Sequence, residues 1–221
     1  VEATQEQNDG KTYRNITSPA KAQVAQTVDQ FRGNYAYNLT DDHFRRFVGS
    51  VPQLVQWDDH EVVNNWFPGE SLEGQGREGY TEMSVDVLAR NGRQAWQEWQ
   101  PVEIGASDRL YRRVSYGPLL DVFILDMRSH KDPNPDAWSG DNVDGLLGPE
   151  QTQWLIDGLR GSTATWKIVA NDLPLALVVP DGKTNFEAVA NGDNGPPLGR
   201  ETELAHILSQ LKARQVRNVV W

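Results

Sequence analysis

The feature that most restricts the fold of this chain is an alternation of short apolar runs with helical patterns. Residues 119–125 are nearly all apolar, and 166–170 and 216–221 are two further runs of strand length. Apolar residues recur at helical spacing in the segment that begins at 148 and again in 201–214. Strands separated by helices are typical of a sheet that helices cover. The sequence therefore predicts an α/β fold built in layers.

Other segments complete the predicted order of elements. Helices are expected at 19–35, 40–48 and 81–99, strands at 52–57 and 110–116, and Gly-rich loops at 68–79 and 180–199. The strand at 110–116 leads through Tyr116-Gly117-Pro118 into 119–125, which predicts an antiparallel hairpin. The sequence contains no recognisable repeat or linker, so residues 1–221 are predicted to form a single domain.

Charge and composition disfavour several classes of protein. The chain has 31 acidic and 21 basic residues, and its formal net charge is -10 at pH 7. Such a chain repels nucleic-acid phosphates, so a nucleic-acid-binding role is not expected. A bound metal cation can reverse the potential locally, which keeps phosphate-containing substrates open. There are no cysteines, and no apolar run approaches the ~20 residues of a transmembrane helix.

The strongest chemical signal is the run Asp58-Asp59-His60-Glu61, which follows the predicted strand at 52–57. Carboxylate and imidazole groups are ligands for Ca²⁺, Mn²⁺, Zn²⁺ and iron. The same run is also typical of a helix N-terminus, with an Asp as the cap and the Glu in the first turn. Residue types alone leave both interpretations open.

A longer pattern around this run resembles a known family. The string Gln-Trp-Asp-Asp-His-Glu-Val at 56–62, followed by Asn64-Asn65-Trp66, resembles the signature of the PhoD-like alkaline phosphatases, a branch of the metallophosphoesterases. Other segments resemble the family in the same order: Leu-Asp-Met-Arg-Ser at 125–129, Gly-Pro-Glu-Gln at 148–151, Trp-Lys-Ile-Val-Ala-Asn-Asp at 166–172, Gly-Arg-Glu at 199–201, and 216–221. The resemblance implies a layered metallophosphoesterase β-sandwich core flanked by helices.

Two metal-binding elements of the family do not occur in this sequence. They are an upstream Gly-Asp-x-x-Tyr element and a downstream Asp-x-His element. We therefore interpret the chain as an internal fragment of a longer enzyme, in which the metal site of the isolated piece would be incomplete.

The resemblance also implies roles for individual residues. Asp59 would be a metal ligand, and His60 would hydrogen-bond the phosphate and help to protonate the leaving group. Asp58 is a candidate for a second ligand or for a residue just behind the ligands. Asn65 and Asp172 are further candidates for oxygen ligands.

Arg128 follows the apolar run at 119–125 and has two possible roles. Its planar guanidinium could clamp a phosphate oxygen, or it could form a salt bridge with Asp126. The sequence leaves both possibilities open.

The function implied is metal-dependent hydrolysis of small phosphate esters by a secreted or periplasmic enzyme that uses Ca²⁺ and Fe³⁺. Two alternatives remain. One is a phosphodiesterase- or phospholipase-type metallophosphoesterase, which the same residues would support. The other is a non-catalytic acidic module that binds Ca²⁺. The sequence does not indicate an oligomeric state.

Overall fold

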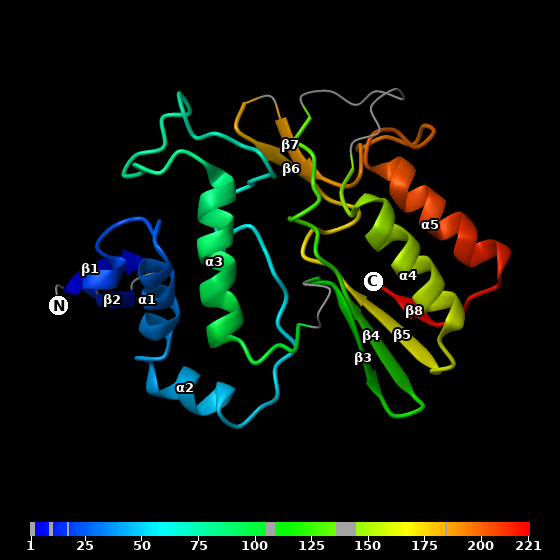
Figure 1. The fold of residues 1–221 in the computed structure, drawn as a ribbon, viewed down its shortest axis with the longest axis horizontal. Helices are drawn as coiled ribbons and strands as arrows, with labels where there is room; N and C mark the ends of the chain where they lie inside the picture. The colour runs from blue at the N-terminus through cyan, green and yellow to red at the C-terminus, as the bar shows by residue number, and fades with distance from the viewer. Residues whose placement is uncertain (1–2, 9–10, 17, 105–108, 136–144, 184) are drawn as a thin grey trace. The chain divides into compact units, whose positions relative to one another are not determined.

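The computed structural model describes residues 3–8, 11–16, 18–104, 109–135, 145–183 and 185–221 (Figure 1). The chain divides into two compact units, each of which is described separately below. The first comprises residues 1–55 and 69–102, and the second comprises residues 56–68 and 103–221. The second unit is therefore assembled from two stretches of sequence.

The first unit combines a hairpin with three helices. Strands β1 (Ala3–Asn8) and β2 (Lys11–Ile16) pair in antiparallel fashion, and a short 3-10 turn at Pro19–Lys21 follows. The helices are α1 (Val28–Asn38), α2 (Asp42–Val48) and α3 (Val85–Trp99). In α3 the buried residues Val85, Leu88, Gly92, Ala95 and Trp96 recur at helical spacing, so one side of this helix faces the core of the unit.

Helices α1 and α3 are held together by contacts between the middle of α1 and the C-terminal end of α3. Arg32 donates two hydrogen bonds to the carboxylate of Glu98, at 2.5 and 2.6 Å, and the rings of Tyr35 and Trp99 stack with centroids 6.3 Å apart. Helix α1 begins at a capping box. The hydroxyl of Thr27 accepts the N–H of Gln30, and the Gln30 side chain accepts the N–H of Thr27.

The second unit is built on a four-stranded sheet of order β3-β4-β5-β8. Its strands are β3 (Arg112–Tyr116), β4 (Leu120–Ile124), β5 (Trp166–Ala170) and β8 (Val219–Val220). Strands β3 and β4 form the predicted antiparallel hairpin, with Gly117 at a φ of 62° in its turn. Strands β4, β5 and β8 are parallel, as expected when helices connect them.

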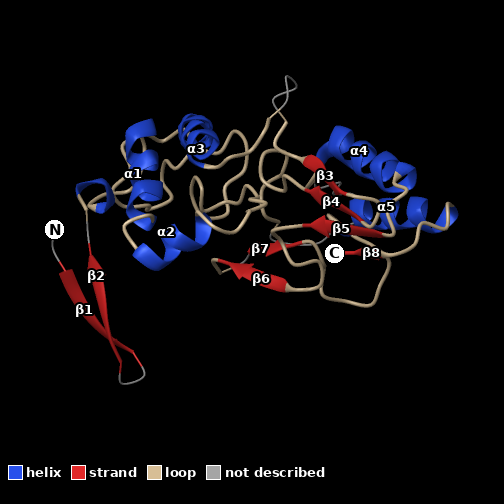
Figure 2. Ribbon diagram, turned by 90° about the horizontal axis from the view of Figure 1, so that it is seen from below, coloured by secondary structure: helices blue, strands red, loops and turns tan. Residues whose placement is uncertain are grey.

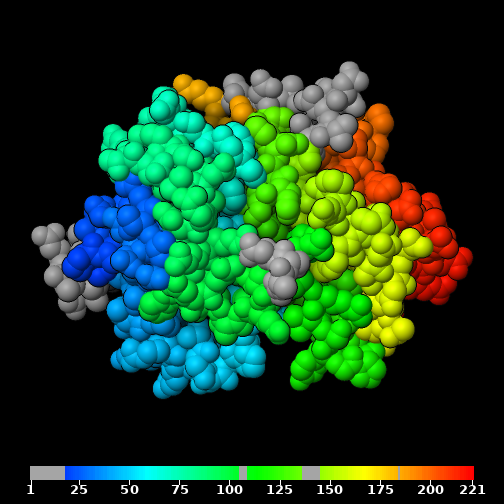
Figure 3. All heavy atoms as spheres, viewed as in Figure 1, coloured from blue at the N-terminus to red at the C-terminus, as the bar shows by residue number. Residues whose placement is uncertain are grey.

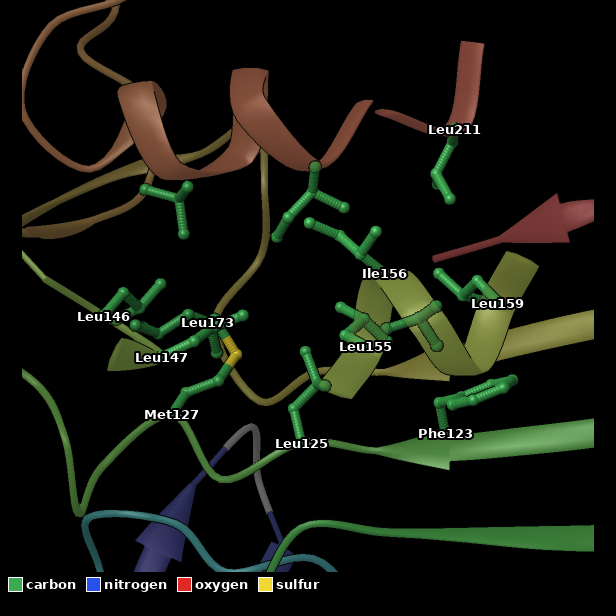
Figure 4. Packing of buried hydrophobic residues seen from close by; sticks show 13 residues of the cluster. Phe123, Leu125, Met127, Leu146, Leu147, Leu155, Ile156, Leu159, Leu173 and Leu211 are labelled. Carbon is green, nitrogen blue, oxygen red and sulfur yellow. The ribbon is translucent and has the colours of Figure 1, made fainter. Parts of the chain in front are cut away.

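Two helices cover one face of this sheet, α4 (Gly148–Gly161) and α5 (Glu201–Ala213) (Figure 2). Leu155 and Leu159 of α4 face Phe123 of β4, and a cluster of buried apolar residues continues from there to α5 (Figure 4). In the space-filling view, residues of α4 and α5 lie at the surface of the unit, coloured from yellow to red (Figure 3). The predicted α/β class is confirmed.

A second hairpin in this unit brings acidic residues close to the main sheet. Strands β6 (Val178–Asp181) and β7 (Asn185–Ala188) pair in antiparallel fashion. The segment 180–199 was predicted to be one loop, and that prediction is wrong for its first part. Gly and Asn residues between and after these strands make the segment read as one loop.

Three other predicted elements differ from the structure. The helix expected at 19–35 is interrupted, because Thr27 caps a separate helix that starts at Val28. The strand expected at 52–57 is absent from the described structure, where this segment has no regular secondary structure. The strand expected at 216–221 is reduced to Val219–Val220, because Gln215 and Asn218 adopt φ angles of 53° and 56°, outside the β region.

The burial of β5 is also one-sided. Lys167 and Val169 are buried, whereas Trp166 is 50% exposed and Ile168 37% exposed. The apolar run 166–170 predicted a strand, which is confirmed, but only one of its faces is covered. No helix in the described residues has both the length and the apolar character needed to cross a bilayer.

Candidate functional site

The candidate site lies where the parallel strands β4 and β5 end. Asp126 and Arg128 follow β4, Asp172 follows β5, and the segment from Gln56 onward crosses both strand ends. The side-chain amide of Gln56 donates to the carbonyl oxygens of Leu125 and Ala170, each at 3.0 Å. The carboxyl ends of parallel strands are where open α/β sheets bind their ligands.

The loop after Gln56 is held by hydrogen bonds within itself. The backbone N–H of Asp58 donates to the carboxylate of Glu61 at 2.8 Å, so Glu61 orients the loop. The N–H of Asn65 donates to Oδ2 of Asp59 at 2.7 Å, and Asn65 has a φ of 59°, which is uncommon for a residue other than glycine. The loop therefore closes around the Asp59 carboxylate, which is 6% exposed.

Arg128 lies at the centre of the site, and its side chain is only 5% exposed. Its Nε donates to Asp172 at 2.5 Å, Nη1 contacts Glu187 at 2.5 Å, and Nη2 lies 2.9 Å from Oδ1 of Asp58. A fourth carboxylate, that of Asp59, is 3.8 Å from Nη2. These acids raise the pKa of Arg128 against the lowering effect of burial, so the guanidinium stays charged.

Asp126 is not the side-chain partner of Arg128. Its carboxylate instead accepts the backbone N–H groups of Arg128 and Ser129, at 3.1 and 2.9 Å. The side chain of Gln151, on α4, bonds to both the N–H and the carbonyl oxygen of Asp126. Asp126 and Gln151 thus fix the turn that presents Arg128.

Asp172 has an unusual environment for a carboxylate. Its side chain is 7% exposed, one oxygen pairs with Arg128, and no donor in the described part of the chain reaches the buried oxygen Oδ1. Burial raises the pKa of Asp172 to about 7, with a further contribution from the neighbouring Asp58 and an opposing one from Arg128.

The two adjacent acids respond differently to the site. Burial raises the pKa of Asp59, although the N–H of Asn65 and the charge of Arg128 oppose this effect. For Asp58, which is 44% exposed, the N–H of Asp59 and the charge of Arg128 outweigh burial and lower the pKa. Asp58 is therefore the more firmly ionised member of the pair.

His60 projects toward solvent, with its side chain 73% exposed. Its Nε2 lies 3.1 Å from Oδ1 of Asn64 and 3.9 Å from Oδ2 of Asp59. The side-chain oxygen of Asn64 can accept a hydrogen bond from Nε2 when that nitrogen is protonated. Nδ1 is then the ring nitrogen suited to exchange a proton with a bound molecule.

Comparison with known proteins identifies the family. A family model described as "PhoD-like phosphatase" matches residues 2–221. The chain belongs to the PhoD-like phosphatase family.

Two relatives show the extent of the match. Alkaline phosphatase D of Bacillus subtilis (strain 168) is 30% identical over 226 aligned residues, which span 93% of this chain and 36% of that protein. A solved structure titled "Structure of PhoD" superposes with a TM-score of 0.66 at 23% identity, covering 88% of this chain and 38% of the other. The chain thus spans little more than a third of the length of each, and the structural likeness supports the metallophosphoesterase-like fold.

The PhoD-like family implies metal dependence, and the residues present fit a hard cation in part. The site offers carboxylate oxygens, which hard cations prefer, and the buried Oδ1 of Asp172 has no donor among the described residues. Arg128 and Lys131 supply two positive charges against the four carboxylates Asp58, Asp59, Asp172 and Glu187. Within the described ranges, however, no three acidic or histidine side chains are arranged to enclose one ion. Asp58, Asp59 and Asp172 would therefore contribute part of a coordination shell.

The structure brings together most of the residues singled out from the PhoD-like sequence pattern. Asp58, Asp59, Arg128 and Asp172 form one cluster, and His60 lies at its solvent side. Asn65 takes part through its backbone, whose N–H reaches Asp59 and whose carbonyl oxygen accepts from Lys131. A ligand role for its side chain remains a prediction.

Sequence reasoning missed two charged residues of the cluster, Lys131 and Glu187. Glu187 contacts both Arg128 and Lys131, and the side chain of Lys131 is completely buried. Glu187 lies in the segment predicted to be a loop. For Lys131, the only sequence signal for a place in the site was its spacing of three residues from Arg128. A lysine in a polar loop is normally solvated, so that signal did not predict a buried side chain.

Proposed function

We propose that the protein containing this chain hydrolyses small phosphate esters with the help of bound metal ions, Ca²⁺ together with Fe³⁺. The observation that carries the proposal is the group of three carboxylates Asp58, Asp59 and Asp172 at the ends of β4 and β5, in which a buried oxygen of Asp172 lacks a donor among the described residues. Membership of the PhoD-like phosphatase family supports the same reaction. From membership of the family we also propose that the protein is secreted or periplasmic.

Bound cations would supply positive charge against the phosphoryl group and acidify the attacking water. Asp59 and Asp172 would hold them from the buried side, and Asp58 from the solvent side. Asn65 fixes Asp59 and Arg128 fixes Asp172 in the structure, and because no three such side chains in the described ranges surround one ion, these carboxylates would have to rearrange around a bound cation. The site would recognise mainly the phosphate itself.

His60 would act on the leaving group. Its exposure lets a substrate reach the ring, and the contact with Asn64 fixes the ring from the Nε2 side. In the imidazolium form Nδ1 also carries a proton, which can pass to the departing ester oxygen. An ester oxygen that leaves protonated is a better leaving group than an alkoxide.

Arg128 would act mainly as the fixed counter-charge of the cluster. Two of its three nitrogens are committed to the nearly buried Asp172 and Glu187, and only Nη2 meets the half-exposed Asp58. For Arg128 to clamp a phosphate, Nη2 would exchange the Asp58 carboxylate for a phosphate oxygen. The other two contacts would hold the guanidinium plane during that exchange.

The test compares Asp59→Asn with a matched surface variant, Asp157→Asn, whose carboxylate on α4 is 62% exposed. In the protein supplied with Ca²⁺ and Fe³⁺, we expect Asp59→Asn to lose bound metal and to lower kcat/KM on p-nitrophenyl phosphate by about 100-fold. Asp157→Asn should match the wild type in both measurements. Parallel assays on bis-p-nitrophenyl phosphate distinguish monoester from diester preference. Unchanged metal content and activity in Asp59→Asn would refute the proposed site.

A further inference from the structure

Lys131 is a buried charged residue that none of the steps above uses. Its side chain is 0% exposed, and burial lowers its pKa although the neighbouring Glu187 opposes that effect. Burying an ammonium group is costly unless its hydrogen bonds are satisfied. A lysine in this position is therefore expected to have a specific set of acceptors.

The acceptors of Lys131 belong mostly to the loop that carries Asp59. Its Nζ donates to the carbonyl oxygen of Asn65 at 3.0 Å and to that of Trp66 at 3.3 Å. Both carbonyls sit just after the point where Asn65 adopts its left-handed conformation. Such a conformation is unfavourable for a residue with a side chain and persists only when surrounding contacts hold it.

The same backbone turn holds the Asp59 carboxylate. The N–H of Asn65 donates to Oδ2 of Asp59, while the carbonyl oxygen of Asn65 accepts from Lys131. Rotating the backbone at Asn65 would disturb both bonds. Lys131 is thus linked to the orientation of Asp59 through one residue, without contacting Asp59 itself.

Glu187 connects this arrangement to Arg128. One of its oxygens contacts Arg128 at 2.5 Å and the other lies 3.2 Å from Nζ of Lys131, while the amide of Asn134 donates to Glu187 as well. Glu187 is 5% exposed, so its charge is compensated by these neighbours and not by water. Lys131 therefore has a fixed position from which to hold the loop.

We propose that Lys131 is a positioning residue, which sets the orientation of the Asp59 carboxylate by holding the backbone carbonyls of Asn65 and Trp66. The catalytic consequence rests on the proposed function, but the positioning itself does not. If Lys131 only filled space, an unbranched apolar side chain of similar length would serve equally well.

The test replaces Lys131 with methionine and measures hydrogen exchange of the Asn65 amide by NMR under native conditions. We expect exchange to become about tenfold faster, because the turn that places this N–H on Asp59 loses its support. The exchange rate of the Val169 amide in β5 should not change. That amide reports on the stability of the sheet, so it shows whether the substitution destabilises the unit as a whole. The matched control is Lys167→Met, since Lys167 is also buried and donates to a backbone carbonyl oxygen, that of Arg217 at 3.3 Å.

The same pair of variants is then tested for activity. Lys131→Met should raise the cation concentration needed for half-maximal activity by about 10- to 100-fold, whereas Lys167→Met should leave it unchanged. If the wild type hydrolyses no phosphate ester with Ca²⁺ and Fe³⁺ present, the proposed function fails, and the exchange measurement alone still decides the positioning role. An unchanged Asn65 amide in folded Lys131→Met, or equal acceleration in Lys167→Met, overturns the inference.

A measurement on the wild type covers the case in which Lys131→Met does not fold. In protein labelled uniformly with ¹⁵N and ¹³C, a hydrogen-bonded Nζ should show a scalar coupling to the carbonyl carbon of Asn65 or Trp66. Detection of that coupling supports the proposal. Its absence, with the corresponding coupling from Lys167 to Arg217 observed in the same sample, contradicts it.

Discussion

Arg128 contributes more than any other residue to the charge balance of the site, with Lys131 as the second positive group. It contacts carboxylates that come from three separate segments, those of Asp58, Asp172 and Glu187. Removing such a group leaves several buried negative charges without compensation, and this costs more than the loss of any one contact. The stability of the unit and the electrostatics of the site therefore respond together to changes at this position.

Substitution of Arg128 by methionine should lower the free energy of unfolding by about 3–5 kcal/mol, because the acids around it remain buried. Added Ca²⁺ should restore part of that loss by supplying positive charge to the same carboxylates. Urea titrations with and without Ca²⁺ measure both effects. Arg45→Met is the control, because Arg45 pairs with Asp42 at the surface and should change stability by less than about 1 kcal/mol. A loss equally small in Arg128→Met would contradict the counter-charge role.

Residues of the site were predictable where a chemical group follows directly on an apolar strand. Asp126, Arg128 and Asp172 satisfy this condition: Asp126 accepts the backbone N–H of Arg128, whose Nε donates to Asp172. Glu187 and Lys131 do not follow directly on an apolar strand. Glu187 lies within the β6–β7 hairpin, and Lys131 lies in a polar turn. Burial of a lysine depends on acceptors more than sixty residues away, which no local pattern contains.

At the scale of elements, the junction of β3, β4 and α4 is fixed by Asp121. Its carboxylate, 1% exposed, accepts from Arg113 and Ser115 of β3 and from Ser162 at the end of α4. Burial alone would raise the pKa of Asp121, but these donors and the charge of Arg113 outweigh it, so the pKa is lowered. Asp121 therefore stabilises the fold in its ionised form.

This lowered pKa predicts how stability depends on pH. The contribution of Asp121 is complete above its unfolded pKa of about 3.9 and is lost as the pH falls through the lower folded value. Asp121→Asn should cost about 3 kcal/mol at pH 7, and the difference from wild type should shrink below about pH 4. Urea unfolding across this range measures it, with the exposed Asp29→Asn as control. A difference that stays constant down to pH 2 would exclude the ionised group as the cause.

Helix α4 offers a matched pair of glycines. A Cβ at Gly158 would lie 2.6 Å from Cε1 of Phe123, whereas one at Gly161 would meet nothing within 4 Å. Alanine favours a helix over glycine by about 1 kcal/mol, but overpacking of a fixed ring costs about 1–3 kcal/mol. Gly158→Ala should therefore be destabilising or at best neutral, and Gly161→Ala neutral or stabilising, in thermal unfolding. Stabilisation by both would show that α4 can shift away from β4.

The elements that could be predicted are those in which the apolar residues recur at the spacing of a helix or strand and are also the residues buried in the structure. Helices α4 and α5 and the β3–β4 hairpin are of this kind. The segment 52–57 was misassigned because its apolar residues suggested a strand, whereas Pro52 lacks an N–H and the Gln56 side chain takes the carbonyls at the strand ends. The interruption before Val28 did have a sequence signal, since Thr27 and Gln30 have the spacing of a capping box.

At the scale of the whole molecule, the two compact units predict separate unfolding transitions. Leu88 in α3 and Leu155 in α4 are both 0% exposed and belong to different units. Replacing either leucine by alanine should lower the free energy of unfolding of its own unit by about 2–5 kcal/mol. In calorimetry we expect two transitions. Leu88→Ala should lower the midpoint temperature of one, and Leu155→Ala should lower that of the other. A single transition that both substitutions shift equally would show that the chain unfolds as one cooperative body.

The bonds of Gln56 also bear on when the site can form during synthesis. Its side chain bonds to carbonyl oxygens 69 and 114 positions later in the chain. Contacts between residues so distant in sequence form slowly, because a long loop must close first. As a chain leaves the ribosome from its N-terminus, the acidic loop is made early but has no strand ends to rest on until β5 has emerged. The nascent protein would thus carry this acidic loop unassembled during the synthesis of the 114 residues that separate Gln56 from Ala170.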